Sequence, residues 1–459
     1  MLVNRMVGWL RMQCLLSGMA AAAATGQSCE TQEVARLDPS EVSSLSQYGG
    51  SVALWGDVGV VGAEGDAALG DFAGSAFLFD AQTGTQLHKL LAHDGQHLRG
   101  FGTSVALNST HAIIGCRINP TNGSARGVYL FDIDTGEQAH KLLPDEHFTD
   151  NGFGSRVAAN DQYILASAIY DDDRGEFAGA VYVFDAHTFD QLWKLKLPDG
   201  VRQDLFGSVI DIHGDKAVIT TRVLNFDNRA REGLVYIFDL VTGQQIARFA
   251  PQHPRTSTYF GSSAAINDSV VAIGSSGLRH DEGGSGAVYM YDIATEEQVG
   301  FLRPTDGERF TGFGASVDMS NDRIVVGARG VSGLHFGAAY QYDGSSHEQM
   351  SKLLPSDLET SIDYFGLAVS IFEDRMLVGS EANDDDGAYT GAAYLFETVC
   401  DPLPCQADLT GDGVLDFFDI SGFLVQFENN GQIADFDGDG VWDFFDISAF
   451  IDAFAAGCP

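Results

Sequence analysis

An aromatic–glycine pair recurs seven times along the chain at nearly constant spacing. Successive pairs lie 52 to 54 residues apart, at Tyr48-Gly49, Phe101-Gly102, Phe153-Gly154, Phe206-Gly207, Phe260-Gly261, Phe313-Gly314 and Phe365-Gly366. A second marker keeps the same register: two aromatic residues at alternate positions, then an acid, from Phe77-Leu78-Phe79-Asp80 in the first copy to Tyr394-Leu395-Phe396-Glu397 in the last. Seven copies in register indicate one structural unit that is repeated along the chain.

The pattern within one copy predicts four short strands. In the second copy, residues 104–107, 111–115, 127–131 and 138–143 are apolar at the two-residue period of strands, with turn residues between them. Four antiparallel strands in each copy make one blade of a β-propeller. A parallel β-helix is the alternative, but its units are much shorter. We therefore predict a mainly β fold, a seven-bladed β-propeller of four-stranded antiparallel blades over residues 30–397.

The two ends of the repeat region predict how the ring closes. The seventh copy stops at Glu397 without a fourth strand, and residues 33–39 resemble the fourth-strand segment 138–144. The N-terminal strand is therefore expected to complete the seventh blade and to remove its open edge. Cys29 and Cys400 flank all seven copies and suggest a disulfide across this seam, whereas Cys116 is left over as a small buried hydrophobe.

The motifs of each copy resemble a known repeat. Phe-Gly-x-Ser-Val-Ala, a strand ending in Val-Gly or Ile-Gly, and Gly-Ala-Val-Tyr-Val-Phe-Asp at 179–185 together resemble the FG-GAP repeat of integrin α chains and many bacterial exported proteins. The resemblance implies a seven-bladed head used in binding or adhesion. Integrin-type blades often hold calcium between their first two strands. Here those connections are as short as Trp55-Gly56-Asp57, which is hairpin chemistry, so we expect no metal in the blades.

A linker at 398–404 leads to an acidic segment, residues 405–459, whose spacing predicts two calcium ions. Loop positions 1, 3, 5, 9 and 12 carry oxygen ligands, position 7 supplies a carbonyl and position 6 is Gly413 or Gly440, as in an EF-hand loop. The predicted ligands are Asp408, Thr410, Asp412, Val414, Asp416 and Asp419, then Asp435, Asp437, Asp439, Val441, Asp443 and Asp446. Cys405 and Cys458 bracket the segment and suggest a second disulfide.

Each loop runs into an apolar helix, and no helix precedes it. We expect one packing face on each helix, formed by Phe423, Leu424 and Phe427 on the first and by Phe450, Ile451 and Phe454 on the second. This pair of loop–helix units resembles the dockerin type I module, which implies that loop positions 10 and 11 contact a cohesin-like or cell-surface partner. These positions are Phe417-Phe418 and Phe444-Phe445, where dockerins have small polar residues, and core packing is the equal alternative.

Charge and the N-terminus limit the partners. The chain has 26 Lys and Arg against 64 Asp and Glu, a net charge of −38, which argues against nucleic acid. Residues 1–26 have a basic start, a short apolar stretch and small residues, as in a secretory signal peptide. That stretch is shorter than the ~20 residues of a membrane span. We therefore expect a secreted or cell-surface protein without a membrane span.

The sequence contains no motif that indicates catalysis. His-Glu-x-x-His, Gly-x-Ser-x-Gly and the P-loop are all absent. We expect no enzyme, and interpret the chain as a calcium-binding adhesion platform whose propeller face binds a protein or polysaccharide. A component of polysaccharide degradation and a structural surface protein are the alternatives. The acidic connections after the second strands, including Asp171 to Asp173, are either a ligand-binding rim or solvated turns.

Overall fold

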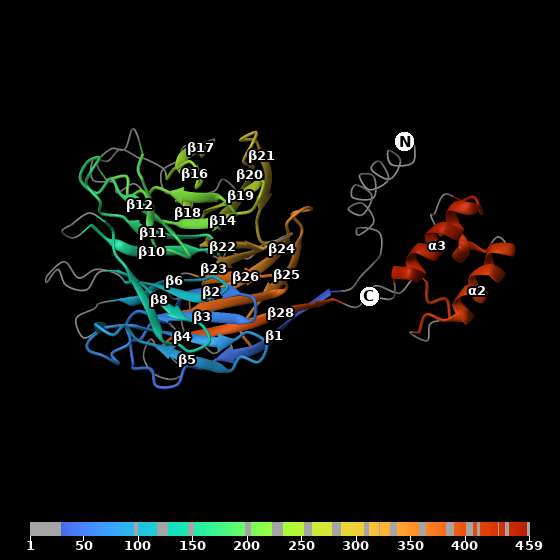
Figure 1. Cartoon of the computed structure of the whole chain (residues 1–459), viewed down its shortest axis with the longest axis horizontal. Coiled ribbons are helices and arrows are strands. Elements are labelled where there is room, and N and C mark those ends of the chain that lie inside the picture. Colours follow the sequence, from blue (N-terminus) through green and yellow to red (C-terminus); the bar gives the residue numbers. More distant parts are fainter. Residues whose placement is uncertain are drawn as a thin grey trace. The chain divides into compact units, whose positions relative to one another are not determined.

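Seven four-stranded antiparallel sheets form the propeller (Figure 1). The computed structural model describes residues 29–95, 100–116, 127–145, 151–197, 203–222, 233–251, 259–277, 286–306, 312–320, 322–330, 337–357, 364–381, 390–400, 407–410, 414–429, 431–436 and 440–456. Two compact units make up the chain, and the propeller unit spans Thr31–Thr398. The predicted fold class and number of blades are confirmed.

The strands follow the predicted repeat closely. In chain order they are β1 (Cys29–Leu37), β2 (Tyr48–Trp55), β3 (Val58–Ala63), β4 (Ser75–Asp80), β5 (Gln86–Leu90), β6 (Phe101–Leu107), β7 (His111–Cys116), β8 (Val128–Asp132), β9 (Gln138–Leu142), β10 (Phe153–Ala159), β11 (Tyr163–Ala168), β12 (Ala180–Asp185), β13 (Gln191–Leu195), β14 (Ile210–His213), β15 (Lys216–Thr220), β16 (Val235–Asp239), β17 (Gln244–Phe249), β18 (Phe260–Ile266), β19 (Val270–Ser275), β20 (Ala287–Asp292), β21 (Gln298–Leu302), β22 (Phe313–Ser320), β23 (Arg323–Ala328), β24 (Ala338–Asp343), β25 (Gln349–Leu353), β26 (Phe365–Phe372), β27 (Arg375–Ser380) and β28 (Ala392–Cys400).

The repeated aromatic residues are the core of the blades. Phe101 packs edge-on against Tyr129 and Phe131, with ring centroids 5.4 and 5.9 Å apart, and all three rings are buried. Edge-to-face pairs of this kind add to the stabilisation that burial provides. Phe153 makes the same contacts in the next blade. The two sequence markers therefore recur because each blade needs the same three rings.

In five blades, a glycine before the third strand forms a bridge to the next blade. Gly74 lies in a parallel bridge with Phe101, the first residue of the next blade's first strand. Its φ of +84° belongs to the left-handed region, and a Cβ there would collide with the Phe101 carbonyl oxygen. Gly391 makes the same bridge with Tyr48, from the seventh blade to the first. This bridge is one of the contacts that close the ring.

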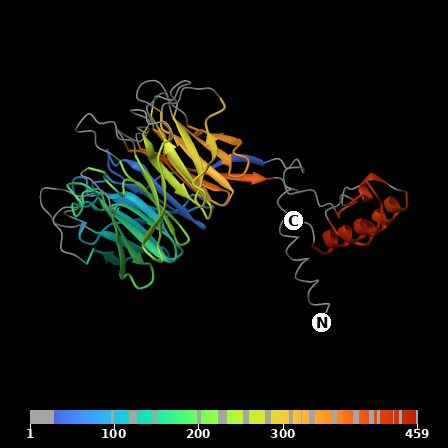
Figure 2. The same ribbon diagram turned by 90° about the horizontal axis from the view of Figure 1, so that it is seen from above.

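The N-terminal strand completes the seventh blade, as predicted. The sheet order is β1-β28-β27-β26, so β1 is the outer strand although it comes first in the chain. Figures 1 and 2 both show β1, in blue, beside β28, in orange. The strand β28 continues to Cys400, three residues beyond the predicted end of the propeller at 397. The first part of the expected linker is therefore strand.

The C-terminal unit contains two helices, α2 (Phe417–Glu428) and α3 (Phe444–Ala456), and a short 3-10 helix, η2 (Gln432–Ala434). Its core is a parallel stack of Phe423 on Phe450, whose ring centroids are 4.1 Å apart. Phe427 and Phe454 pack beside this stack, but Leu424 and Ile451 are about half exposed. The expected packing face was wrong for these two residues, because the next position along a helix turns ~100° away from the stack.

Candidate functional site

The described connections of the blades lie at two ends of the propeller. The first-to-second and third-to-fourth strand turns meet at one end: the Ala81 N–H donates to the Asp57 carbonyl over 2.8 Å. Connections 64–74 and 169–179 lie at the other end, with the connections between blades; there the Gly100 N–H donates to the Phe72 carbonyl over 3.0 Å. We call these ends the turn face and the loop face.

Two loop-face turns have nearly the same sequence and the same conformation. Residues 70–74 read Gly-Asp-Phe-Ala-Gly and residues 175–179 read Gly-Glu-Phe-Ala-Gly. Each turn is closed by a hydrogen bond from its alanine N–H to its first glycine carbonyl, of 3.0 and 2.9 Å. The aromatic residues Phe72 and Phe177 have φ values of 57° and 60°. Such turns favour glycine at this position, because a side chain there costs roughly 1–2 kcal/mol.

The rings of these two turns face solvent. Phe72 is 48% exposed and Phe177 is 36% exposed, and the Phe177 ring meets the half-exposed Tyr170 edge-on, with centroids 5.5 Å apart. The backbone beneath each ring is fixed, since the carbonyl of Phe177 accepts the Leu205 N–H over 3.1 Å. Comparing the repeat copies with one another would have revealed this pentapeptide, which the sequence analysis missed.

Acids in the same connections organise the loops. Asp66 is 1% exposed, accepts the Ser75 hydroxyl over 2.7 Å and lies 3.1 Å from Lys89 Nζ. Burial alone would raise the pKa of Asp66, but the hydrogen bonds from Ser75 and Lys89 hold it below its usual value. Asp171 is also buried, 3.0 Å from Lys194 Nζ. For these two acids the solvated-turn interpretation was wrong, because both are buried and paired with lysines. The acidic residues at 281–282 and 384–386 lie outside the described residues.

Two carboxylates line the centre of the ring. Asp211 on β14 and Asp318 on β22 belong to first strands, which pack against one another around the axis. The other blades have a small residue at this position: Ala53, Ala106, Ala158, Ala265 and Ser370. Burial, followed by the charge of Asp318, raises the pKa of Asp211 to about 7, and burial also raises the pKa of Asp318. Aligning the copies would have shown the two substitutions.

Each of these carboxylates also joins its blade to the next. Asp211 Oδ2 accepts the Ile266 N–H over 3.0 Å. Asp318 Oδ2 accepts the Ile371 N–H over 2.8 Å and the Ser370 hydroxyl over 3.0 Å. The pair therefore combines contacts between blades with a mutual repulsion that favours the protonated form.

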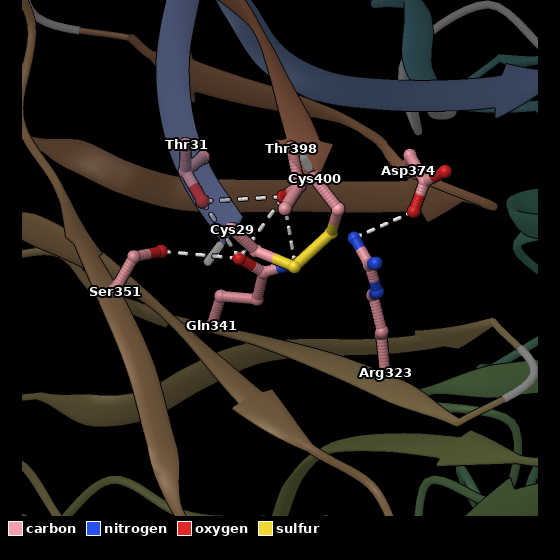
Figure 3. The surroundings of a disulfide bond; sticks show 8 residues. All are labelled: Cys29, Thr31, Arg323, Gln341, Ser351, Asp374, Thr398 and Cys400. Atoms are coloured by element: carbon pink, nitrogen blue, oxygen red, sulfur yellow. Dashed lines mark hydrogen bonds and ion pairs between the residues drawn. A yellow bond between two sulfur atoms is a disulfide. The ribbon is translucent and has the colours of Figure 1, made fainter. Parts of the chain in front are cut away.

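The seam beside β1 contains the predicted disulfide and a buried polar cluster (Figure 3). Cys29 and Cys400 are bonded, and Cys116 is buried and belongs to no disulfide, as expected. Gln341 of the sixth blade is fully buried, and its Oε1 accepts the hydroxyls of Thr31 and Ser351 over 3.0 and 3.1 Å. Its Nε2 donates to the Thr398 hydroxyl over 3.0 Å. Cys405 and Cys458 lie outside the described residues.

The predicted calcium ligands of the tail surround the helix N-termini. Asp419 and Asp446 are fully buried; Asp419 accepts the N–H groups of Thr410 and Asp416, and these bonds lower its pKa. Asp446 accepts two N–H groups as well, from Phe436 and Asp443. Asp408 accepts the Thr410 hydroxyl, and Asp416 caps α2 through the Phe418 N–H. The other described ligand positions are Val414, Asp435, Val441 and Asp443, whereas Asp412, Asp437 and Asp439 lie outside the described residues.

Among the described residues of the tail, one buried oxygen lacks a hydrogen-bond partner. Asp435 Oδ1 is buried without a hydrogen-bond donor, while its Oδ2 accepts the Gly440 N–H over 3.0 Å. The described parts of the chain contain no group of three or more His, Cys, Asp or Glu side chains placed to hold a metal.

The paired phenylalanines of the tail are surface residues. Phe417 and Phe418 are 72% and 67% exposed, and Phe444 and Phe445 are 72% and 65% exposed. The core interpretation of these four residues was therefore wrong. No helix within the described residues is long and apolar enough to cross a membrane.

Comparison with family models identifies the repeat. The FG-GAP repeat model matches residues 31–79, 85–131, 137–184, 297–342 and 347–396, which is more than half of the chain. The fourth blade and the first three strands of the fifth blade fall between these matches, although both blades form complete four-stranded sheets. A comparison with curated proteins finds no significant match. The chain belongs to the FG-GAP repeat family.

Proposed function

We propose that this protein is an exported binding or adhesion platform whose loop face holds a protein or polysaccharide partner. The observation that carries the proposal is the pair of closely similar turns that expose Phe72 and Phe177 in a left-handed conformation. Strained, exposed aromatic residues lower stability, so their presence twice in one sequence context favours a role in recognition. An FG-GAP propeller suggests the same class of function.

Blocking one face at a time tests the proposal. Asp71→Cys places a thiol in an exposed loop-face turn, and Val241→Cys places one in a turn-face position that is 60% exposed. Each variant is labelled with biotin and saturated with streptavidin. Binding of the immobilised protein to extracellular proteins and glycans is then measured. We expect blockage at position 71 alone to remove binding, and equal binding by both blocked variants would refute the proposal.

Export and calcium binding belong to the same proposal. The Cys29–Cys400 bridge is typical of proteins in oxidising compartments, which supports a signal peptide at 1–26. In the tail, all predicted ligands are oxygen donors, as calcium prefers, and the buried Asp435 Oδ1 has an unused acceptor. Two calcium ions held by the predicted ligands would offset the repulsion among the clustered carboxylates and stabilise α2 and α3. We expect a chelator to lower helical circular dichroism of the full chain; an unchanged spectrum would count against the metal.

The tail is proposed to attach the protein to a partner. Both helices begin with two exposed phenylalanine rings, Phe417 and Phe418 on α2 and Phe444 and Phe445 on α3. These rings could pack against an apolar surface of a cohesin-like or cell-surface partner. Replacing all four by Ser should leave the Phe423–Phe450 core intact and weaken cell attachment. Attachment equal to that of the native chain would refute this role.

Polysaccharide degradation is a second candidate, favoured by the axial carboxylate pair. Glycoside hydrolysis uses two carboxyl groups, one of which keeps its proton near neutral pH, and Asp211 has this property. Assays of reducing-end release from a glycan panel test this candidate, with Asp211→Asn as the matched variant. Release by the native chain that the variant lacks would favour an enzyme, and no release by either would exclude it.

A further inference from the structure

We propose that the turns 70–74 and 175–179 recognise cationic side chains, so that the loop-face partner is a Lys- or Arg-rich segment of a protein. The inference rests on the proposed function and specifies the chemistry of that partner. It depends on the acid–phenylalanine pairs Asp71-Phe72 and Glu176-Phe177, which occupy the same positions in the two turns and whose phenylalanines have nearly the same left-handed φ.

The propeller itself shows how this chemistry binds an ammonium group. Lys141 Nζ lies 4.9 Å from the centroid of the Tyr129 ring and 2.6 Å from Asp94 Oδ2. Lys352 lies in the same way over Tyr340, at 5.8 Å, and 2.8 Å from an aspartate. A ring face and a carboxylate together therefore hold a lysine at several places in this fold. Asp71-Phe72 and Glu176-Phe177 combine the same two groups, with rings that face solvent.

The turns are organised before any partner arrives. Each phenylalanine carbonyl accepts a hydrogen bond from the segment that leads into the next blade. The last glycine of each turn donates to the backbone carbonyl of a buried acid, Gly74 N–H to Asp66 and Gly179 N–H to Asp171. A rigid backbone lowers the entropy that binding costs. A cation over an exposed ring contributes roughly 0.5–1 kcal/mol, and more once water is excluded.

Charge selects among the partners that could stack on these rings. The chain carries a net charge of −38, and the connection 64–74 contains Glu64 and the exposed Asp71. This field attracts a basic segment and repels anionic polymers, and its effect weakens with salt. A neutral glycan would also stack on phenylalanine, but its affinity would depend little on salt or on the adjacent carboxylates.

The experiment measures binding of a fluorescent peptide to the full chain at low and high salt. The probe is a Gly-Ser-Lys repeat peptide; the controls are the same peptide with Gln for Lys, and a neutral cello-oligosaccharide. The key variant is Phe72→Gly/Phe177→Gly, which removes both rings and relieves the left-handed strain. We expect it to weaken binding of the Lys peptide about tenfold without lowering the melting temperature. Val241→Ala on the turn face should change neither quantity.

Three outcomes would overturn the inference: equal affinity of the native chain for the Lys and Gln peptides, undiminished binding by the double-glycine variant, or salt-independent binding of the cello-oligosaccharide that exceeds peptide binding. The last outcome would leave the loop face as the binding surface and change only the partner. Failure of the proposed function is distinguished by the streptavidin experiment, in which blockage at position 71 would have no effect on any ligand.

Discussion

Arg36 on the N-terminal strand lies 2.6 Å from Asp357 in the segment that leads into the seventh blade. Asp357 also accepts the Tyr394 hydroxyl over 2.9 Å. Two other blades repeat this arrangement with a lysine from the fourth strand: Lys141, Asp94 and Tyr129, and Lys352, Asp306 and Tyr340. Arg36 therefore occupies the place of the fourth-strand lysine. The strand β1 matches these outer strands both in its position and in the ion pair that it makes with an aspartate.

Replacing Arg36 tests this equivalence. Arg36→Ala should lower the free energy of unfolding by about 1 kcal/mol, because the pair is partly buried and Asp357 would lose its cation. Arg36→Lys restores the residue type of the second and sixth blades and should recover most of the loss. Urea denaturation of both variants measures the effect, and equal stability of Arg36→Ala and the native chain would contradict it.

The disulfide should matter more than any single side chain of the seam. The bond closes a loop of 371 residues, and removing such a constraint from the unfolded chain costs up to ~5 kcal/mol. We expect Cys29→Ser/Cys400→Ser to melt at a clearly lower temperature under non-reducing conditions. A reducing agent should lower the melting temperature of the native chain toward that of the variant. Identical melting of both proteins without reductant would show that the bond does not stabilise closure.

Gln341 leads to a less intuitive prediction. Most of the other blades have an aliphatic residue at this position, such as Leu78 and Leu130, so Gln341→Leu restores the common pattern. The change should still destabilise the protein by roughly 1–3 kcal/mol, because the buried hydroxyl groups of Thr31 and Thr398 would lose a partner. The triple variant Gln341→Leu/Thr31→Val/Thr398→Val removes three of the four polar groups of the cluster, leaving Ser351, and should recover most of the stability. A single variant at least as stable as the native chain would refute this argument.

Asp211 predicts a pH dependence with a definite sign. Its pKa of about 7 in the folded state exceeds the usual value of 3.8, so the folded state keeps a proton that the unfolded state releases. The stabilisation is complete below about pH 4 and is lost as the pH rises toward 7. Asp211→Asn keeps an acceptor for the Ile266 N–H and removes the titration.

The measurement for Asp211 is the difference in unfolding free energy between Asp211→Asn and the native chain, at several pH values from 4 to 8. This difference should shift in favour of the variant by at least about 1 kcal/mol over the interval. Subtracting the native values removes the opposite trend of acids such as Asp66, whose pKa is lowered. A difference that stays constant with pH would contradict the raised pKa.

The repeat made the propeller predictable, because Phe101, Tyr129 and Phe131 are core residues that every blade must supply. Closure of the ring by the N-terminal strand was predictable for the same reason, since residues 33–39 share the pattern of a fourth strand. The axial pair and the Gln341 cluster were not predicted. In both cases the residues depart from the repeat, and the contacts that they make depend on which blades lie next to each other. Which apolar side chains of the tail are exposed could also be learned only from the structure, as Leu424 and the four tail phenylalanines show.

The central claim is that β1 closes the ring as the outer strand of the seventh blade. Hydrogen–deuterium exchange of the β1 amides, measured in the full chain, tests this claim most directly. If β1 is the outer strand of the seventh blade, the amides of Thr31–Leu37 should be protected to a similar degree as those of the outer strands Gln138–Leu142 and Gln349–Leu353. Exchange of Thr31–Leu37 at the rate of unstructured peptide, with the other outer strands protected, would contradict ring closure by the N-terminal strand.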